Sequence, residues 1–176
     1  MSKDIAEIVN SLVRENGVKQ IALVVRDLDA SVRSYWELLR IGPWTSYTLT
    51  PDILKDMTYH GVPTEFSFRH ALAWKAEVQF ELVQPLSGPS IFADHLEAHG
   101  EGLHHVGIYV PNQPQAMREL EAEGYRCVQS AWGFGAEGDG AFAYYKTDHP
   151  LATIIEVIGA PKVRRSPTFV YPADQN

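Results

Sequence analysis

The run Gln20-Ile21-Ala22-Leu23-Val24-Val25 opens a pattern that returns at His105-Val106-Gly107-Ile108-Tyr109-Val110. In both copies an apolar strand leads through a short turn into a run with helical spacing, predicted at 30–39 and 115–123, the first capped by Asp29. Each copy closes on an apolar strand that carries one carboxylate, Glu81 in the first and Glu156 in the second. The first copy is longer, and its segment 51–63, which holds two prolines, reads as an insertion or flap. The pattern therefore predicts a duplicated unit.

Composition narrows the class of protein. The 176 residues are 45% hydrophobic and 21% charged, which is typical of a globular protein with one sizeable core or two small modules sharing one. The net charge of −7, without a basic stripe, argues against a nucleic-acid partner. Cys127 is the only cysteine, which excludes an intrachain disulfide framework and a thiolate metal cluster. No apolar run approaches the ~18 residues of a membrane helix and no signal peptide is visible, so we expect a cytoplasmic protein without a membrane partner.

Breaks at glycine and proline divide the chain. We expect an N-terminal helix in 1–17, a first βαβββ module in 18–85, a linker with a short helix in 86–102, a second βαβββ module in 103–159 and an extended tail in 160–176. The tail carries three prolines and could pack on a neighbouring subunit.

Four polar residues hold equivalent positions in the two copies: Gln20 and Glu81 in the first, His105 and Glu156 in the second. An ionised carboxylate among apolar neighbours costs several kcal/mol unless it is paired or bound to a cation. For any one of these residues, a solvent-facing or simply hydrogen-bonded position is the plainer explanation. Their equivalence across the repeat favours a shared centre. One amide oxygen, one imidazole nitrogen and two carboxylate oxygens suit Zn, Ni, Co, Fe or Mn.

Three segments carry a family resemblance: Gly100-Glu101-Gly102-Leu103-His104-His105-Val106, Phe80-Glu81-Leu82-Val83-Gln84-Pro85 and Ile154-Ile155-Glu156-Val157. Over residues ~18 to 158 the chain resembles the vicinal oxygen chelate superfamily, which includes glyoxalase I, methylmalonyl-CoA epimerase, extradiol dioxygenases and fosfomycin-resistance proteins. The resemblance implies an α+β fold, in which two paired βαβββ modules form a curved, barrel-like mixed sheet around a central cleft. It also implies one divalent metal ion per chain on Gln20, Glu81, His105 and Glu156. Homodimers are common in the family.

The Gly-Leu-His-His stretch is most similar to the epimerase branch, yet epimerases of this type usually have His where this chain has Gln20. The set Gln, Glu, His, Glu resembles that of animal-type glyoxalase I. Gln20 argues against extradiol dioxygenase chemistry, which needs two His and one carboxylate, and no cation-binding loop of the fosfomycin type is found. The resemblance thus implies a metal-dependent isomerase or lyase that uses proton transfer next to a carbonyl and a metal-stabilised enolate. An acyl-CoA epimerase comes first; the alternatives are a glyoxalase I-like lactoylglutathione lyase and a metal-free protein that sequesters hydrophobic ligands or antibiotics.

For catalysis we expect Glu156 as ligand and displaceable base, with Glu81 second. Glu65 resembles the second acid of methylmalonyl-CoA epimerase, although the register holds an extra residue and a surface charge is an equal alternative. Arg69, with His60 and His70, is a candidate for binding a substrate carboxylate or phosphate, and the glycine-rich segment 133–140 is a candidate lid. The substrate is expected to be a small molecule with vicinal oxygens, with an acyl-CoA as one candidate, held in a mainly apolar pocket. The aromatic candidates for this pocket are Trp44, Phe68, Trp74, Trp132, Phe134, Phe142 and Tyr144.

Overall fold

The computed structural model describes residues 6–147 and 153–173. Its helices are α1 (Ala6–Asn16), α2 (Leu28–Leu39), α3 (Ile91–His99) and α4 (Gln113–Ala122). Its strands are β1 (Gln20–Val24), β2 (Trp44–Leu49), β3 (Lys55–Tyr59), β4 (Val62–Pro63), β5 (Ser67–Lys75), β6 (Val78–Ser87), β7 (Gly102–Tyr109), β8 (Arg126–Phe134), β9 (Gly140–Thr147), β10 (Thr153–Gly159) and β11 (Phe169–Tyr171). All these strands belong to one mixed sheet in the order β11-β2-β5-β6-β1-β7-β10-β9-β8-β3-β4. Among the described residues no helix is long and apolar enough to cross a membrane.

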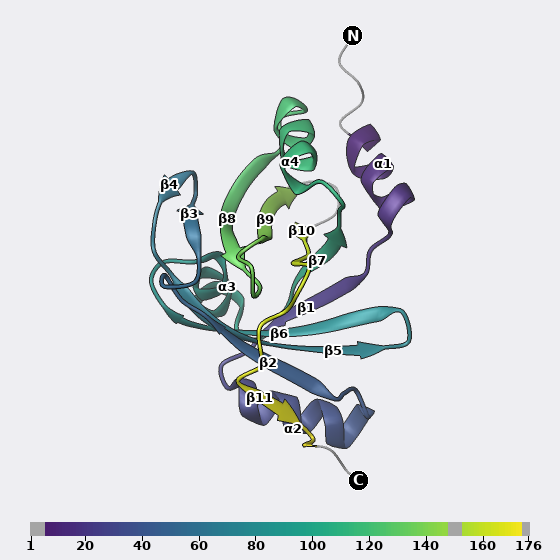
Figure 1. Cartoon of the computed structure of the whole chain (residues 1–176), viewed down its shortest axis with the longest axis vertical. Coiled ribbons are helices and arrows are strands. Elements are labelled where there is room, and N and C mark those ends of the chain that lie inside the picture. The colour runs from purple at the N-terminus through teal and green to yellow at the C-terminus, as the bar shows by residue number, and fades with distance from the viewer. Residues whose placement is uncertain (1–5, 148–152, 174–176) are drawn as a thin grey trace.

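The sheet consists of two half-sheets with the same internal order. From the centre outward, the N-terminal half-sheet runs β1-β6-β5-β2 and the C-terminal half-sheet runs β7-β10-β9-β8. In each half the first strand lies parallel to the closing strand, and β1 and β7 pair antiparallel at the centre. The sheet curls around an interior, as Figure 1 shows, which confirms the predicted α+β fold with a curved mixed sheet.

Two segments cross from one half to the edge of the other. The segment read as a flap contains the hairpin β3–β4, and β3 pairs with β8 of the C-terminal half-sheet. At the opposite edge β11, near the C-terminus, pairs antiparallel with β2 of the N-terminal half-sheet. The tail therefore lies against its own chain, and Figure 1 shows it passing in front of the sheet between β10 and β11.

Helices cover the outer face of the curled sheet. Helix α2 packs on β5 and β6, and the buried residues between them include Leu28, Val32 and Trp44. Helices α1 and α4 cover the C-terminal half-sheet through Leu12, Leu120 and their neighbours. Helix α3 instead contributes to an inner cluster of buried apolar residues, which is rich in aromatic rings: Phe66, Phe68, Phe92, Phe142 and Tyr144. The candidate site lies beside this inner cluster.

The N-terminus of α2 corrects one expectation. Asp27, rather than Asp29, is the N-cap, since its side chain accepts a hydrogen bond of 3.0 Å from the Ala30 N–H. Asp29 lies in the first turn, where its carboxylate pairs with Arg69 at 2.7 Å. Both positions favour a carboxylate, one through the cap and the other through the helix dipole, so composition alone did not separate them.

Candidate metal centre

Two rows of paired residues cross the middle of the sheet. The first row runs over β6, β1 and β7, and the second over β1, β7 and β10. The rows are Glu81–Ala22–His105 and Gln20–Gly107–Glu156. Residues paired across neighbouring strands project to the same face, so each row places two polar side chains on one face with a small residue between them. The four residues singled out by the repeat therefore converge because the pairing of β6, β1, β7 and β10 aligns them in two adjacent rows.

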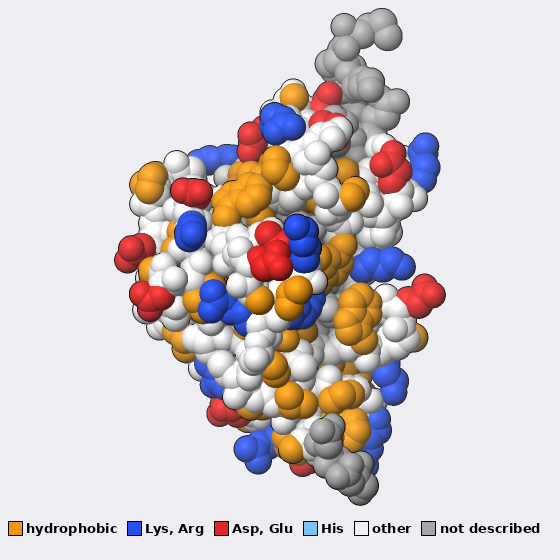
Figure 2. Space-filling view, in the orientation of Figure 1, with side chains coloured by type: hydrophobic (Ala, Val, Ile, Leu, Met, Phe, Trp, Pro, Cys, Tyr) orange, Lys and Arg blue, Asp and Glu red, His pale blue; other side chains and the backbone are white. Residues whose placement is uncertain are grey.

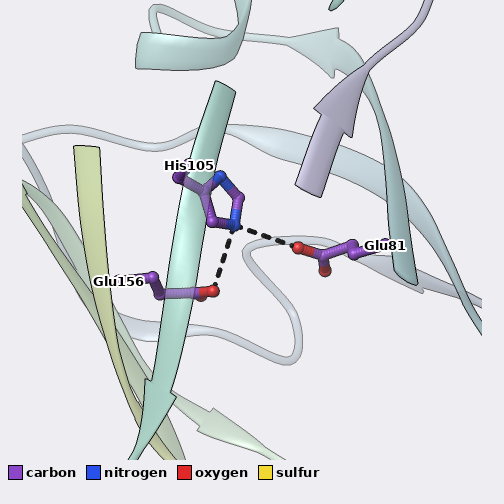
Figure 3. A group of neighbouring side chains, drawn as sticks. All are labelled: Glu81, His105 and Glu156. Atoms are coloured by element: carbon purple, nitrogen blue, oxygen red, sulfur yellow. Dashed lines mark ion pairs between the residues drawn. The ribbon is translucent and has the colours of Figure 1, made fainter. Parts of the chain in front are cut away.

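Three of these side chains make direct contact. His105 Nε2 lies 3.2 Å from Glu81 Oε2 and 3.1 Å from Glu156 Oε2, as Figure 3 shows. All three residues are buried, and His105 is 0% exposed. One ligand atom from each residue lies within 4.8 Å of the others, which is the spacing of groups that could hold a metal ion.

The two carboxylates also determine the charge of His105. Burial by itself would lower the pKa of His105, but Glu156 and Glu81 raise it to about 9. Burial would likewise raise the pKa of Glu81, but contacts with His105 and His70 lower it to about 2. Without a metal, His105 is thus an imidazolium at neutral pH, beside an ionised Glu81. This arrangement supplies one positive charge where a metal ion would supply two.

The fit of a metal can be judged from atoms without hydrogen-bond partners. Of the described residues, nine buried side-chain nitrogen and oxygen atoms lack such a partner. Four of the nine belong to the proposed centre: Gln20 Oε1, Glu81 Oε2, His105 Nε2 and Glu156 Oε2. Three of these four atoms meet only in the ion pairs of His105, and a buried polar atom without a hydrogen bond is costly. Together the four are a donor set that a divalent ion could bind. The residues present therefore fit a metal.

The Gln20 amide is oriented by its neighbours. Its Nε2 donates to Gln79 Oε1 at 3.0 Å, and the Tyr109 hydroxyl donates to the same oxygen at 2.6 Å. Burial raises the pKa of Tyr109 to about 12, against the opposing effect of the Arg164 guanidinium, so the hydroxyl keeps its proton. With its nitrogen held by Gln79, Gln20 presents its oxygen to the small cavity that Glu81 and Glu156 also line.

A second histidine fixes the proton positions on His105. His104 Nε2 lies 3.3 Å from the Ile91 carbonyl oxygen, and His104 Nδ1 lies 2.8 Å from His105 Nδ1. A carbonyl can only accept, so His104 donates through Nε2 and accepts at Nδ1. His105 then donates through Nδ1, which leaves the Nε2 lone pair for the metal. Burial lowers the pKa of His104 to about 2, which keeps it neutral, as this chain of hydrogen bonds requires.

His70 also acts on the centre. Its Nδ1 lies 2.6 Å from Glu81 Oε1, the oxygen that does not face His105. His70 follows Phe68 by two residues on β5, so both side chains project to the inner face. Sequence reasoning gave His70 only as a possible anion ligand. The signal that could have found this contact is its inward alternation with Phe68.

Two neighbouring cavities lie at or near the centre. The inner one, about 30 Å³, is lined by Gln20, Glu81 and Glu156 among others and has room for about one ion or water. The outer one, about 540 Å³, lies within the size range of small-molecule sites. Leu49, His70, Phe134, Pro161 and Arg164 line both cavities. The two cavities are therefore neighbours, separated or joined by the same five side chains.

The aromatic candidates divide between the cavities and the outer core. Four of the predicted pocket aromatics line the inner cavity: Phe68, Phe134, Phe142 and Tyr144. Trp44 is fully buried in the cluster beneath α2, and Trp74 is 50% exposed near the end of β5. Trp132 is half-buried on β8 and lines neither cavity. Strand alternation separates inner from outer positions, and the sequence alone did not say which face of each strand is inner.

The charged candidates lie farther out. Arg69 pairs with Asp29 and lines a separate hollow beside α2 and Phe169. Glu65 is exposed between β4 and β5 and lines neither cavity. His60 lies 3.9 Å from Asp94. Of the segment 133–140, Phe134, Gly135 and Ala136 form part of the outer cavity wall.

Comparison with known proteins identifies the family. The family model of the Glyoxalase/Bleomycin resistance protein/Dioxygenase superfamily matches residues 19–145. The chain belongs to this superfamily. Its fold is that of the vicinal oxygen chelate proteins, and the resemblance seen in the sequence is confirmed.

Solved structures with this fold include several epimerases. Methylmalonyl-CoA epimerase from Mycobacterium tuberculosis matches with a TM-score of 0.62 and 21% identity, over 84% of this chain and 91% of that one. A methylmalonyl-CoA epimerase in complex with methylmalonyl-CoA and NH4+ matches with a TM-score of 0.60 and 16% identity, over 85% and 97%. A 4-hydroxymandelate synthase mutant from Streptomyces coelicolor matches with a TM-score of 0.58 and 14% identity, over 86% and 50%. A search of curated proteins returned no significant match. Identities this low establish the fold that is shared.

Proposed function

We propose that the chain is a metal-dependent enzyme that moves a proton on a carbon next to a carbonyl, with an acyl-CoA thioester as substrate. The observation that carries this proposal is the cluster of four buried donor atoms without hydrogen-bond partners, from Gln20, Glu81, His105 and Glu156, beside a small cavity that shares five lining residues with a larger one. A protein that only sequesters an apolar ligand gains nothing from burying this set. Epimerases that share the fold support the choice of acyl-CoA over other carbonyl compounds.

The residues have separable roles in such a reaction. A divalent ion bound by the four donors would act as a Lewis acid toward a substrate carbonyl. Glu156, which lines the inner cavity, is the first candidate for the base that removes the proton, and Glu81 is the second. Glu81 is held from both sides by His105 and His70, so it is the less free of the two to move. Glu65, which lies outside both cavities, is the weakest candidate for the second acid of an epimerisation.

Metal content tests the site. Protein purified without a metal-chelating tag is expected to hold about one transition metal per chain, and His105→Ala with Glu156→Gln is expected to hold none. Glu97→Gln, which removes an exposed carboxylate from α3, is the matched control and should keep its metal. If wild type holds no metal and takes up none on reconstitution, the enzyme proposal fails.

Proton exchange tests the reaction. The metal-loaded protein in D₂O is expected to exchange the C2 hydrogens of propionyl-CoA, followed by mass spectrometry, and Glu156→Gln is expected to lose most of this exchange. Exchange on a glutathione hemithioacetal with none on acyl-CoA would instead favour the glyoxalase-like lyase, for which the Gln, Glu, His, Glu donor set is the supporting observation. A metal-loaded protein that exchanges neither would contradict the proposed reaction.

A further inference from the structure

Residues of the C-terminal tail form one wall of the outer cavity. Residues 160–168, here called the strap, run from the end of β10 to the start of β11 and supply Pro161, Arg164, Arg165, Ser166 and Thr168 to the lining. The opposite wall is mainly apolar, with Leu49, Ile53 and Phe134. A ligand in this cavity would therefore have an apolar body against the sheet and a polar group toward the strap.

The strap is fixed at both ends by hydrogen bonds. Val163 accepts a hydrogen bond of 2.8 Å from the Ala136 N–H at the turn between β8 and β9. At the other end, the backbone N–H and the hydroxyl of Thr168 donate to the Ser46 carbonyl on β2 at 2.7 and 2.9 Å. Arg165 Nε donates to the Gly135 carbonyl at 3.1 Å. The two arginines between these anchors are thus held over the cavity by backbone contacts.

Neither strap arginine forms an ion pair with a described carboxylate. Among the described residues, no carboxylate lies within 4 Å of the Arg164 or Arg165 side-chain nitrogens, whereas Arg69 pairs with Asp29 at 2.7 Å. Figure 2 shows this face of the molecule, where basic, acidic and hydrophobic side chains lie close together near the middle.

Arg164 connects this charge to the candidate metal centre. It lines both cavities and lies beside the Tyr109 hydroxyl, which in turn bonds the Gln79 that orients Gln20. A guanidinium offers paired N–H donors that match the oxygens of a carboxylate or a phosphate.

We infer that the outer cavity is an anion-binding subsite, in which Arg164 binds a carboxylate or phosphate of a ligand whose carbonyl end reaches the inner cavity. The inference rests on the proposed function for the carbonyl end alone; the subsite itself follows from the strap. It makes Arg164 a residue that determines specificity, since a neutral ligand of the same shape leaves the guanidinium without a partner.

Three thioesters distinguish the two anions. Methylmalonyl-CoA and propionyl-CoA differ by one carboxylate, and S-propionyl-N-acetylcysteamine lacks the phosphates of both. Affinities are measured by titration calorimetry on the metal-loaded full chain for wild type, Arg164→Gln and Arg164→Lys. Arg118→Gln, an exposed arginine of α4, removes the same charge away from the cavity and is the control.

If Arg164 binds the carboxylate, Arg164→Gln weakens the affinity for methylmalonyl-CoA about fivefold or more and leaves the affinity for propionyl-CoA unchanged. If it binds a phosphate, the affinity for both CoA esters falls by that factor and the affinity for the cysteamine thioester does not change. Arg164→Lys should retain part of the affinity in either case. Equal affinities in Arg164→Gln and Arg118→Gln for all three ligands would overturn the subsite and leave the proposed reaction standing.

Malonate and pyrophosphate, titrated in EDTA, test the arginine without any thioester. At least one of them is expected to bind wild type and Arg118→Gln alike and Arg164→Gln about fivefold more weakly. If no thioester binds but this difference is found, the acyl-CoA proposal fails and the anion subsite stands. If neither anion distinguishes the variants and no thioester does, the subsite is overturned.

Discussion

His105 Nε2 faces two carboxylate oxygens at nearly equal distance, and one N–H cannot be directed at both. In the metal-free centre the proton on His105 Nε2 therefore cannot make a well-directed hydrogen bond to both Glu81 and Glu156. The raised pKa of about 9 means that the proton stabilises the metal-free fold below about pH 6.5 and that this stabilisation is lost as pH rises through 9. A metal ion replaces that proton with a charge that all four donors can share.

Metal binding should accordingly release about one proton per ion between pH 6 and 8, because His105 must deprotonate while Glu81, with a pKa near 2, is already ionised. Metal affinity should rise about tenfold per pH unit as the pH approaches 9. Calorimetry in two buffers of different ionisation enthalpy counts the protons. A count of zero would show that His105 is not a ligand.

His104 should affect metal affinity without touching the metal. His104→Ala removes the acceptor that holds the His105 proton on Nδ1, and loss of such a partner typically costs about 10- to 100-fold in affinity. His99→Ala, an exposed histidine of α3, is the matched control and should bind metal like wild type. Competition with a fluorescent chelator measures both. Equal affinities would mean that the His104 contact is only packing.

The repeat made the four donor residues visible in the sequence, since each alone reads as an ordinary strand residue. Their supports were not visible. His104 is next to His105, and neighbours on a strand point to opposite faces, so its contact depends on where α3 places the Ile91 carbonyl. Gln79 and Tyr109 lie on different strands, and only the register joins them to Gln20.

At the scale of elements, β1 and β7 bring the donors together by keeping small residues between them. A methyl group added at Gly107 would lie 2.4 Å from Gln20 Oε1 and 2.9 Å from Ile158 Cδ1. Ala22, which holds the equivalent place in the first row, is fully buried. The strands thus leave room at the positions that separate two donors.

Gly107→Ala should therefore displace Gln20 and destabilise the fold by about 1 to 3 kcal/mol, the usual cost of overpacking. A Gln20→Ala background removes the closest contact, with Oε1, but keeps the contacts with the Cβ of residue 20 at 2.8 Å and with Ile158 Cδ1, so the cost of the added methyl should be smaller without vanishing. Urea unfolding of the two single variants and the double variant gives the coupling between the sites. Strictly additive free energies would show that Gly107 does not make room for Gln20.

The elements that the sequence predicted are those with their own periodicity. Strands β1, β6, β7 and β10 are apolar runs, and α2 and α4 have helical spacing with caps. Strands β3 and β11 have five and three residues, and each pairs with a strand that is distant in the sequence; the two-residue β4 pairs with β3. Local sequence does not specify such pairing, which explains why 51–63 read as a flap and the tail as unattached.

At the scale of the molecule, the candidate centre joins the two half-sheets. Gln20 and Glu81 come from one half, and His105 and Glu156 come from the other. A bound ion therefore adds its binding free energy to the stability of the whole fold, since the unfolded chain does not hold the four donors together.

Free metal at about 100 times its dissociation constant should stabilise the fold by about 2.7 kcal/mol, and EDTA should lower the unfolding temperature correspondingly. Glu156→Gln is expected to lose this dependence, while Glu97→Gln should keep it. Differential scanning calorimetry with and without EDTA measures the shift. If EDTA did not change the unfolding temperature of a metal-loaded sample, this result would contradict a metal centre shared by the two half-sheets.

The strands that cross from one half of the chain to the edge of the other half-sheet, β3–β4 and β11, also form the two edges of the whole sheet. One outer edge is the two-residue β4 and the other is the three-residue β11, and both are too short to template another chain. A chain shortened to residue 168 would leave the hydrogen-bonding groups of β2 open to a second molecule. Light scattering should then detect growing aggregates, so β11 would protect the protein from aggregation as well as anchor the strap.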